Sequence, residues 1–320
     1  MRRNRLAACS LFIGIVLPCA AARAKPIIHL QDCIAAPDGT TTLVADLKKP
    51  TVFGIDRDIE NLPVRFTCGG KEVGRIRSDN DGRAVLECKL PDSQGMAIEA
   101  AASVNGVEIR AEARVYRCKP DRVIVVVDID DTISDTHFND AWYGKEDRDS
   151  MPIRHSRETL VDVARDFQIL YLTARPCSLL GKTQRWLATH GFPAAPVLVS
   201  YRKADLLDQG KFKQRQLKRL KGAWPNVLIG IGDRSRDARA YGGSGMLSLI
   251  VNRSGDFGPR SLAMADWNVL HAFFRNNRAT LADPDQCRRL IAGERPRQRI
   301  ARSNDDRKRD AAPPLLSETR

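Results

Sequence analysis

The chain has 320 residues and carries 52 Lys and Arg against 39 Asp and Glu, which gives a formal net charge of +13. A chain of this length exceeds the usual domain of about 100–200 residues, so we expect two folded domains. The basic excess is partly local, because residues 288–310 hold nine Lys and Arg. Such a run is typical of a solvated segment that can contact an anionic membrane surface, and it contains no pattern for sequence-specific nucleic-acid binding.

Residues 1–24 have the pattern of an export signal. Three arginines near the start precede an apolar stretch, and Ala22-Arg23-Ala24 is a small-x-small cleavage site. An uncleaved membrane anchor is the alternative, but the apolar stretch is shorter than the roughly 20 residues that a span needs, and Pro18 interrupts it. We therefore expect an exported protein, which in a bacterium would be periplasmic.

Six cysteines would remain after cleavage, and an even number in an exported chain permits disulfides. Their spacing leaves about 15 connectivities open, and pairs between Cys33 and Cys118 and between Cys68 and Cys88 would each close within the first domain. No C-x-x-C spacing favours a metal site. The six residues are Cys33, Cys68, Cys88, Cys118, Cys177 and Cys287.

Residues 25–120 consist of short segments that alternate apolar and polar residues and are separated by turn residues. Their close and regular spacing predicts an antiparallel β-sandwich of the immunoglobulin-like kind. Asn105-Gly106 is the dipeptide favoured in tight β-hairpin turns, so a hairpin is expected there.

Residues 121–275 follow a different pattern, in which continuous apolar runs alternate with amphipathic helical stretches. Continuous runs are typical of parallel strands that are buried on both faces, so we expect a doubly wound α/β sheet. Residues 276–320 are expected to form a basic, largely disordered tail. The expected strands are 123–127, 167–173, 195–200, 226–232 and 247–252, and the expected helices are 156–166, 178–191, 210–222 and 235–243.

Polar side chains stand where these strands end, which is where parallel α/β sheets bind ligands. Asp128 and Asp130 follow the first strand, Thr173 ends the second, Asp233 follows the fourth, and Lys213 lies in the helix before it. Carboxylates clustered at the end of a buried strand need a cation, and Mg²⁺ prefers oxygen ligands. With that ion and a lysine shielding a phosphoryl group, an aspartate can attack phosphorus.

This constellation resembles the four motifs of the haloacid dehalogenase superfamily. The first motif, D-x-D-x-T, is Asp128-Ile129-Asp130-Asp131-Thr132, and the fourth, G-D-x-x-x-D, is Gly232-Asp233-Arg234-Ser235-Arg236-Asp237. The resemblance implies that Asp128 is the nucleophile and a metal ligand. It also implies that Asp130 is the general acid and base and gives its carbonyl to the metal.

The same resemblance assigns supporting roles to four further residues. Thr173 and Lys213 would bind the phosphoryl oxygens, Asp233 would complete the metal site, and Asp237 would orient the lysine. Thr132 belongs to the first motif.

Three further residues lie near these motifs. Lys211 competes with Lys213, but Lys213 has Leu217 and Leu220 at helical spacing, which favours Lys213 as the inward residue. Asp131 is expected to have a structural or surface role. Arg175, two residues after Thr173, is a further candidate for substrate binding.

Residues 122–255 resemble more closely the phosphatase domain of lipins and the related C-terminal domain of phosphatidylinositol-transfer proteins, through "DIDDTIS", "YLTARP" and "GDRSRDARAYG". The chain departs from the lipin pattern at Asp131, where lipins have Gly, and at Asp233, where they have Asn. Some transfer-protein relatives lack the catalytic aspartates and bind lipid without hydrolysis, whereas this chain keeps Asp128 and Asp130.

The sequence therefore predicts an exported, Mg²⁺-dependent phosphatase that forms an aspartyl-phosphate. The gaps between the motifs leave no room for a large cap domain, which favours a large substrate such as the membrane lipid phosphatidate. Two alternatives stay open: a broad-specificity exported acid phosphatase of small phosphomonoesters, and a non-catalytic lipid- or surface-binding module.

Overall fold

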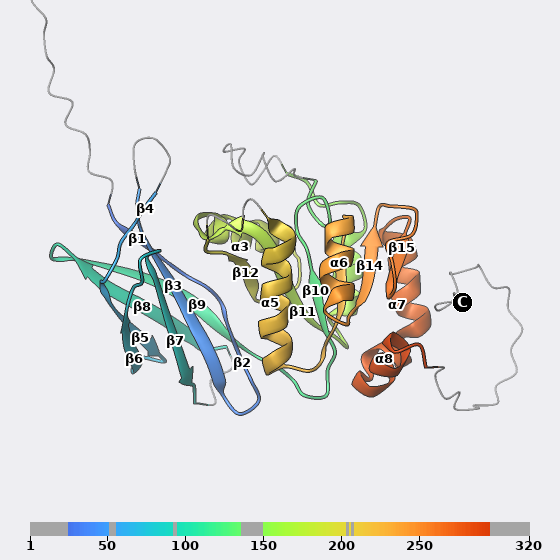
Figure 1. Cartoon of the computed structure of the whole chain (residues 1–320), viewed down its shortest axis with the longest axis horizontal. Helices are drawn as coiled ribbons and strands as arrows, with labels where there is room; N and C mark the ends of the chain where they lie inside the picture. Colours follow the sequence, from blue (N-terminus) through green and yellow to red (C-terminus); the bar gives the residue numbers. More distant parts are fainter. Residues whose placement is uncertain are drawn as a thin grey trace, which may run out of the picture.

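The structure, a computed structural model, describes residues 25–50, 56–91, 95–135, 150–202, 205 and 208–294. The expected export signal at 1–24 and the segment 295–320 lie outside these residues. The described residues form an all-β half, which ends at Arg117, and an α/β half, which begins with the strand at Ile124 (Figure 1). No helix among them is both long and apolar enough to cross a bilayer.

The all-β half contains two sheets. One has the order β1-β3-β4 with β7 also paired to β3, and the other has the order β2-β9-β8-β5-β6. In chain order the strands are β1 (Ile27–Leu30), β2 (Cys33–Ala35), β3 (Thr40–Lys49), β4 (Arg57–Asp58), β5 (Pro63–Cys68), β6 (Lys71–Arg77), β7 (Arg83–Lys89), β8 (Ala97–Val104) and β9 (Val107–Arg117).

Both sheets contribute side chains to one hydrophobic core, which includes Leu43 and Leu47 from β3 and Phe66 and Ile98 from the second sheet. All strand pairs are antiparallel except β2 with β9, which is parallel. The hairpin at Asn105-Gly106 is confirmed: it joins β8 to β9, and both turn residues have positive φ, as a tight I′-type turn requires. The immunoglobulin-like assignment stays a prediction.

The α/β half is built on a six-stranded parallel sheet, as expected from the continuous apolar runs. Its order is β12-β11-β10-β13-β14-β15, so β10 is central and the chain winds to either side of it. The strands are β10 (Ile124–Val127), β11 (Gln168–Pro176), β12 (Val197–Ser200), β13 (Val227–Gly232), β14 (Leu247–Val251) and β15 (Ser261–Met264).

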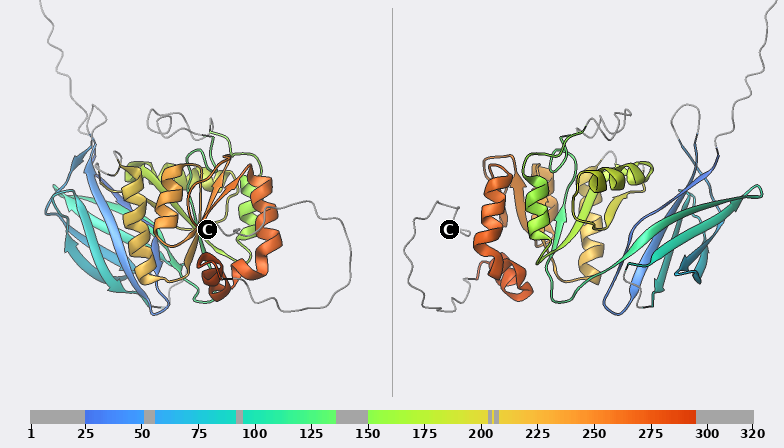
Figure 2. Two further views of the ribbon diagram at one scale, coloured as in Figure 1. Left: turned by 45° about the vertical axis from the view of Figure 1, so that its right-hand side comes forward. Right: turned by 180° about the vertical axis from the view of Figure 1, so that it is seen from behind.

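Helices cover both faces of this sheet, since successive residues of a strand point to opposite faces. Val125 and Val127 of β10 pack in a core with α2, α3 and α7, whereas Val126 packs in a second core with α5 and α6. Figure 1 shows α5 and α6 in front of the sheet, and Figure 2 shows α2 and α7 from behind. The helices are α2 (Ser156–Val163), the short 3₁₀ helix η1 (Cys177–Leu179), α3 (Leu180–Thr189), α5 (Gln209–Ala223), α6 (Ser235–Gly243), α7 (Trp267–Ala282) and α8 (Pro284–Ile291).

The expected domain boundary at residue 275 is wrong. It falls inside α7, and α8 follows directly and continues the fold to Ile291. Phe274, Leu281 and Cys287 are fully buried in the core on that face of the sheet. The arginines between these apolar residues concealed a helical pattern: Arg275 is exposed and Arg278 pairs with Asp162 of α2, while the apolar residues at helical spacing point inward.

The expected disulfides are also not formed, because all six cysteines are free thiols. Cys33 packs in the core of the all-β half, whereas Cys118 packs in a core of the α/β half. Cys68 is buried in the all-β core and Cys88 packs against it. Burial raises the pKa of Cys33 to about 12, as expected for an inert structural thiol.

Buried polar contacts join the two halves. The carboxylate of Asp32 accepts hydrogen bonds from the backbone N–H of Arg114 in β9 (3.2 Å), the side-chain amide of Gln184 in α3 (3.0 Å) and the backbone N–H of Val197 in β12 (3.3 Å). Burial raises the pKa of Asp32. One carboxylate therefore ties a strand of the all-β half to a helix and a strand of the α/β half.

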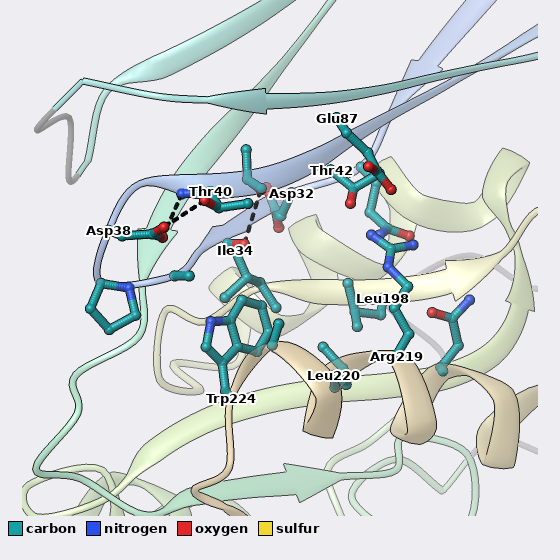
Figure 3. Close-up of a pocket in the computed structure, with 16 residues that line it drawn as sticks. Asp32, Ile34, Asp38, Thr40, Thr42, Glu87, Leu198, Arg219, Leu220 and Trp224 are labelled. Atoms are coloured by element: carbon teal, nitrogen blue, oxygen red, sulfur yellow. Dashed lines mark hydrogen bonds between the residues drawn. The ribbon is translucent and has the colours of Figure 1, made fainter.

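A cleft of about 560 Å³ opens beside this contact, between β2, β3 and α5. Figure 3 shows that Ile34 faces Leu220 and Trp224 across it, while Thr42 and Glu87 lie near Arg219.

Asp46 in β3 provides a pH test of the junction between the halves. Its side chain is fully buried, accepts a hydrogen bond from the Cys177 thiol at 2.7 Å, and lies 3.1 Å from the Lys48 ammonium. Burial outweighs these partners and raises the pKa of Asp46 to about 6. The folded chain therefore holds this proton up to a higher pH than the unfolded chain, whose Asp has a pKa of about 3.9.

We expect the free energy of unfolding to fall as the pH rises from about 4 to about 6, because ionising Asp46 costs more in the folded state. Asp46→Asn has no carboxyl group to ionise, so its free energy of unfolding should not show this fall. The difference between the variant and the original chain should therefore rise by up to about 3 kcal/mol between pH 4 and pH 6. Urea unfolding of both chains at pH 4, 5, 6 and 7 measures the difference. A difference that does not change with pH would contradict the role of Asp46.

Candidate active site

The expected site residues meet at the carboxyl end of the parallel sheet. Asp128 directly follows β10 and Asp233 directly follows β13, and these two strands are neighbours. The backbone N–H of Asp128 donates to Ile231 at 2.9 Å, which extends the ladder beyond the strand. The two carboxylates are held side by side by the sheet itself.

Lys213 reaches the two strand ends from α5. Its ammonium lies 2.9 Å from Asp128 and 2.6 Å from Asp237, and the side chain is almost fully buried. Leu217 and Leu220 are buried on the same helix, so the expectation from helical spacing is confirmed. Lys211 instead pairs with Asp208 at 3.0 Å, with 79% of its side chain exposed.

Asp237 in the first turn of α6 is held at both of its oxygens. One accepts from Lys213, and the other accepts from the backbone N–H of Arg234 at 3.1 Å, which satisfies a free donor at the helix start. Gly232 makes this approach possible, because a Cβ there would lie 2.6 Å from the Cβ of Asp237. The glycine of the fourth motif is thus required by close packing.

The electrostatics of this cluster favour a further cation. Carboxylate oxygens of Asp128, Asp233 and Asp237 lie within 4.8 Å of one another, and all three residues are buried. Burial, together with the neighbouring acids, raises the pKa of Asp128 to about 7 and also raises that of Asp233. Although burial opposes it, the paired carboxylates raise the pKa of Lys213 well above its ordinary value.

These residues fit a divalent metal ion. Lys213 pairs with Asp128 and Asp237, and the partly exposed Arg234 and Arg253 lie 3.5 Å from Asp233, so the three buried carboxylates are only partly compensated, and hard oxygen ligands suit Mg²⁺. Asp237 is held at both oxygens by Lys213 and the Arg234 backbone, whereas Asp128 contacts Lys213 through one oxygen and Asp233 has only the longer contacts of 3.3 Å to Thr132 and 3.5 Å to two arginines, so Asp128 and Asp233 are the better candidates for metal ligands. The carboxylate of Asp130 is not part of the cluster, so Asp130 could contribute only its backbone carbonyl, as the sequence resemblance implied.

Arg175 forms an ion pair with Asp130. Its Nη2 and Nε lie 2.7 and 3.0 Å from Oδ1 of Asp130, and its Nη1 donates to Thr183 at 3.1 Å. The Thr173 hydroxyl donates to the other oxygen of Asp130 at 3.2 Å. Thr173, expected to bind the phosphoryl group, and Arg175, expected to help bind the substrate, here fix the carboxylate of Asp130.

Thr132 connects the first motif to the fourth. Its hydroxyl donates to Asp233 at 3.3 Å, and its carbonyl accepts from the buried indole of Trp267 at 2.9 Å. The threonine of the D-x-D-x-T motif therefore orients Asp233 and anchors the loop to α7.

Two arginine contacts were not anticipated. Asp131 has a φ of 58°, a left-handed conformation that favours glycine, and its carboxylate pairs with Arg234 at 2.5 Å. Arg253 donates to the Asp233 carbonyl at 3.0 Å. The lipin pattern has Gly at the position of Asp131, and glycine is favoured where φ is positive. This departure was therefore the sequence signal for the left-handed backbone at residue 131.

Lys213 should be essential for stability as well as for the site. Lys213→Met would leave Asp128 and Asp237 buried without their cation, and loss of one partner from a buried ion pair costs about 3–5 kcal/mol. Urea unfolding in EDTA at pH 8 should show a loss of this size, and the loss should shrink at pH 5 as the carboxylates become protonated.

Lys211→Met is the matched control, since it removes an exposed lysine from the same helix. It should change the free energy of unfolding by less than about 0.5 kcal/mol. Equal effects of the two variants would refute the buried ammonium as the stabilising charge.

The comparisons with known proteins agree with this geometry. Residues 125–248 match the family model described as the LNS2 domain of PITM 1-3. No curated protein sequence matches the chain significantly. The matched segment covers less than half of the chain and contains all of the residues described above except Trp267 and Arg253.

Three solved structures illustrate more distant similarity. The D,D-heptose 1,7-bisphosphate phosphatase of B. bronchiseptica has 13% identity and a TM-score of 0.38, covering 48% of this chain and 99% of its own. A haloacid dehalogenase-like hydrolase from Xanthomonas campestris has 14% identity and a TM-score of 0.35, covering 51% and 99%. Titin M4 has 12% identity and a TM-score of 0.22, covering 29% and 95%.

The family match, the parallel sheet and the four motifs at its carboxyl end lead to one conclusion. Residues 125–248 of this chain are similar to the LNS2 domain, and the α/β half carries the four motifs of the haloacid dehalogenase superfamily at the carboxyl end of a parallel sheet.

Proposed function

We propose that this protein is a Mg²⁺-dependent phosphatase that hydrolyses a phosphomonoester through an aspartyl-phosphate on Asp128. The observation that carries the proposal is the buried cluster in which Lys213 lies between Asp128 and Asp237, with Asp233 alongside. A structural ion pair would need one lysine and one acid. Three acids around one lysine leave a site for a metal and a phosphoryl group.

In the first step, an oxygen of Asp128 attacks phosphorus and the bond from phosphorus to the leaving oxygen breaks. Asp130 supplies a proton to that oxygen, so the product alcohol leaves neutral. Lys213 lies 2.9 Å from Asp128 and can neutralise charge on the transferred phosphoryl oxygens. In the second step, Asp130 takes a proton from water, which attacks phosphorus, and the bond to Asp128 breaks to release phosphate.

Arg175 and Thr173 regulate when Asp130 can act. Together they occupy both carboxylate oxygens of Asp130, so neither oxygen can reach a leaving group until Arg175 turns away. A substrate phosphoryl group offers the guanidinium an alternative bidentate partner. Substrate binding would thereby release Asp130 and give Arg175 the substrate-binding role expected from the sequence.

Asp128, Asp233 and the carbonyl of Asp130 would hold the metal ion. A bound Mg²⁺ supplies positive charge that neutralises the phosphoryl oxygens and lets a carboxylate approach them. Thr132 and Arg253 keep Asp233 in position for this purpose.

The short connections around the site support a large substrate. Only residues 128–155 separate β10 from α2, and the chain from β11 to α5 is taken up mostly by η1, α3 and β12. Connections of this length leave no room for a large cap domain, and an open site suits a phosphate on a membrane lipid such as phosphatidate. In the same proposal, residues 1–24 export the protein, to the periplasm in a bacterium, and the basic residues beyond 294 contact the anionic membrane.

Phosphate release by residues 25–320 tests the function. With Mg²⁺, phosphatidate in mixed micelles should be hydrolysed faster than a soluble aryl phosphate, and EDTA should abolish both reactions until Mg²⁺ is restored. Asp128→Asn should lower kcat by at least about a thousandfold, because it removes the nucleophile. Asp121→Asn, an exposed acid before the same strand, should keep full activity.

Other outcomes would change the assignment. Preference for the soluble ester would replace the lipid substrate by small phosphomonoesters. Lipid binding without Mg²⁺-dependent turnover of either substrate would contradict catalysis and favour a binding module.

A further inference from the structure

A basic notch lies between the first turns of α5 and α6, at the same edge of the sheet as the active site. Its volume is about 470 Å³. It is lined by Asp208, Gln209, Gly210, Lys211, Gln214, Arg236 and Arg239. None of these residues has a role in the proposed mechanism.

The notch carries an excess of positive charge. Lys211, Arg236 and Arg239 contribute three cations against the single carboxylate of Asp208, which pairs with Lys211. Within the described part of the chain, Arg236 and Arg239 form no ion pair, and the Nε of Arg236 is buried without a hydrogen-bond partner. Two guanidinium groups are thus gathered in one hollow without acids to neutralise them.

The geometry of the two helices keeps this hollow open. Gly210 faces α6, since a Cβ on it would lie 3.9 Å from the Cβ of Arg236. Because residue 210 has no side chain, the gap between the first turns of α5 and α6 is lined by the basic side chains.

The notch and the active site share the same two helix starts. Lys211 precedes Lys213 by two residues on α5, and Arg236 directly precedes Asp237 on α6. Residues at these offsets point to different sides of a helix. Lys213 and Asp237 therefore face inward to the catalytic cluster while Lys211 and Arg236 face the notch.

We propose that the basic notch is a second anion subsite, which binds a phosphate group next to the phosphoryl group that is hydrolysed. A net charge of +2 in the lining matches a phosphate dianion, and guanidinium groups bind phosphate oxygens in a bidentate manner. The anion is either a second phosphoryl group of a soluble substrate or a neighbouring anionic headgroup of a membrane that contains the substrate. A role of the subsite in substrate selection rests on the proposed phosphatase function. Anion binding in the notch does not depend on that function.

Binding to the Asp128→Asn chain with Mg²⁺ tests the subsite without turnover. The probes are alkane-α,ω-diol bisphosphates of increasing length and alkyl monophosphates of equal length, measured by calorimetry. At the length that spans the two sites, the bisphosphate should bind about tenfold more tightly than the monophosphate. Arg239→Gln should abolish that advantage, whereas Lys218→Gln, which removes an exposed cation from α5 outside the notch, should preserve it.

Vesicles distinguish the two sources of the anion. If the anion is a headgroup, the chain should bind phosphatidylcholine vesicles only when they contain phosphatidylglycerol, and Arg239→Gln should weaken this binding more than Lys218→Gln. The proposal is overturned if bisphosphates have no advantage at any length and Arg239→Gln and Lys218→Gln affect vesicle binding equally. Turnover by the unsubstituted chain is scored separately, so loss of the subsite and loss of the phosphatase function give different results.

Discussion

The ammonium of Lys213 is the charge on which the catalytic end of the molecule depends. It lies between Asp128 at the end of β10 and Asp237 in the first turn of α6, and so joins the sheet to two helices. Buried carboxylates repel one another, and without this lysine their repulsion would open the space between the strand ends. Lys213 and the more distant Arg234 and Arg253 compensate the three carboxylates only in part, and the remaining negative charge suits a metal ion.

Close packing of α6 against β13 fixes the positions of these charged side chains. Gly232 lets Asp237 approach β13, and Gly230 lets the ring of Tyr241 cover the strand, because a Cβ there would lie 2.3 Å from the ring. Tyr241 is fully buried beside α5, so α6 cannot slide along the sheet. The positions of Lys213 and Asp237 are therefore set by packing, while the energetic need for both is set by charge.

Sequence patterns predicted the parallel sheet and the residues that meet at its edge, because strand ends in such a sheet converge whatever the loops do. They did not predict the partners of those residues. Arg175 was expected to face the substrate, yet its contact with Asp130 depends on how far β11 extends past β10, which hydrophobic runs do not encode. The pair between Asp131 and Arg234 depends on a single backbone angle. The helices after residue 275 were missed because their many arginines lowered the mean hydropathy of segments with a continuous buried stripe.

The helix α5 has a consequence for any attempt to divide the molecule. Its first turns carry Lys213, its last turn carries Leu220, and Trp224 directly follows it; Leu220 and Trp224 line the cleft against the all-β half. A helix behaves as a stiff rod over this length, so displacement of one end moves the other. Removing the all-β half would expose an indole and aliphatic side chains to water and free the far end of the rod. We therefore expect Lys213 to be less firmly positioned in the isolated α/β half. The N-terminal strands thus help to hold the site in its geometry.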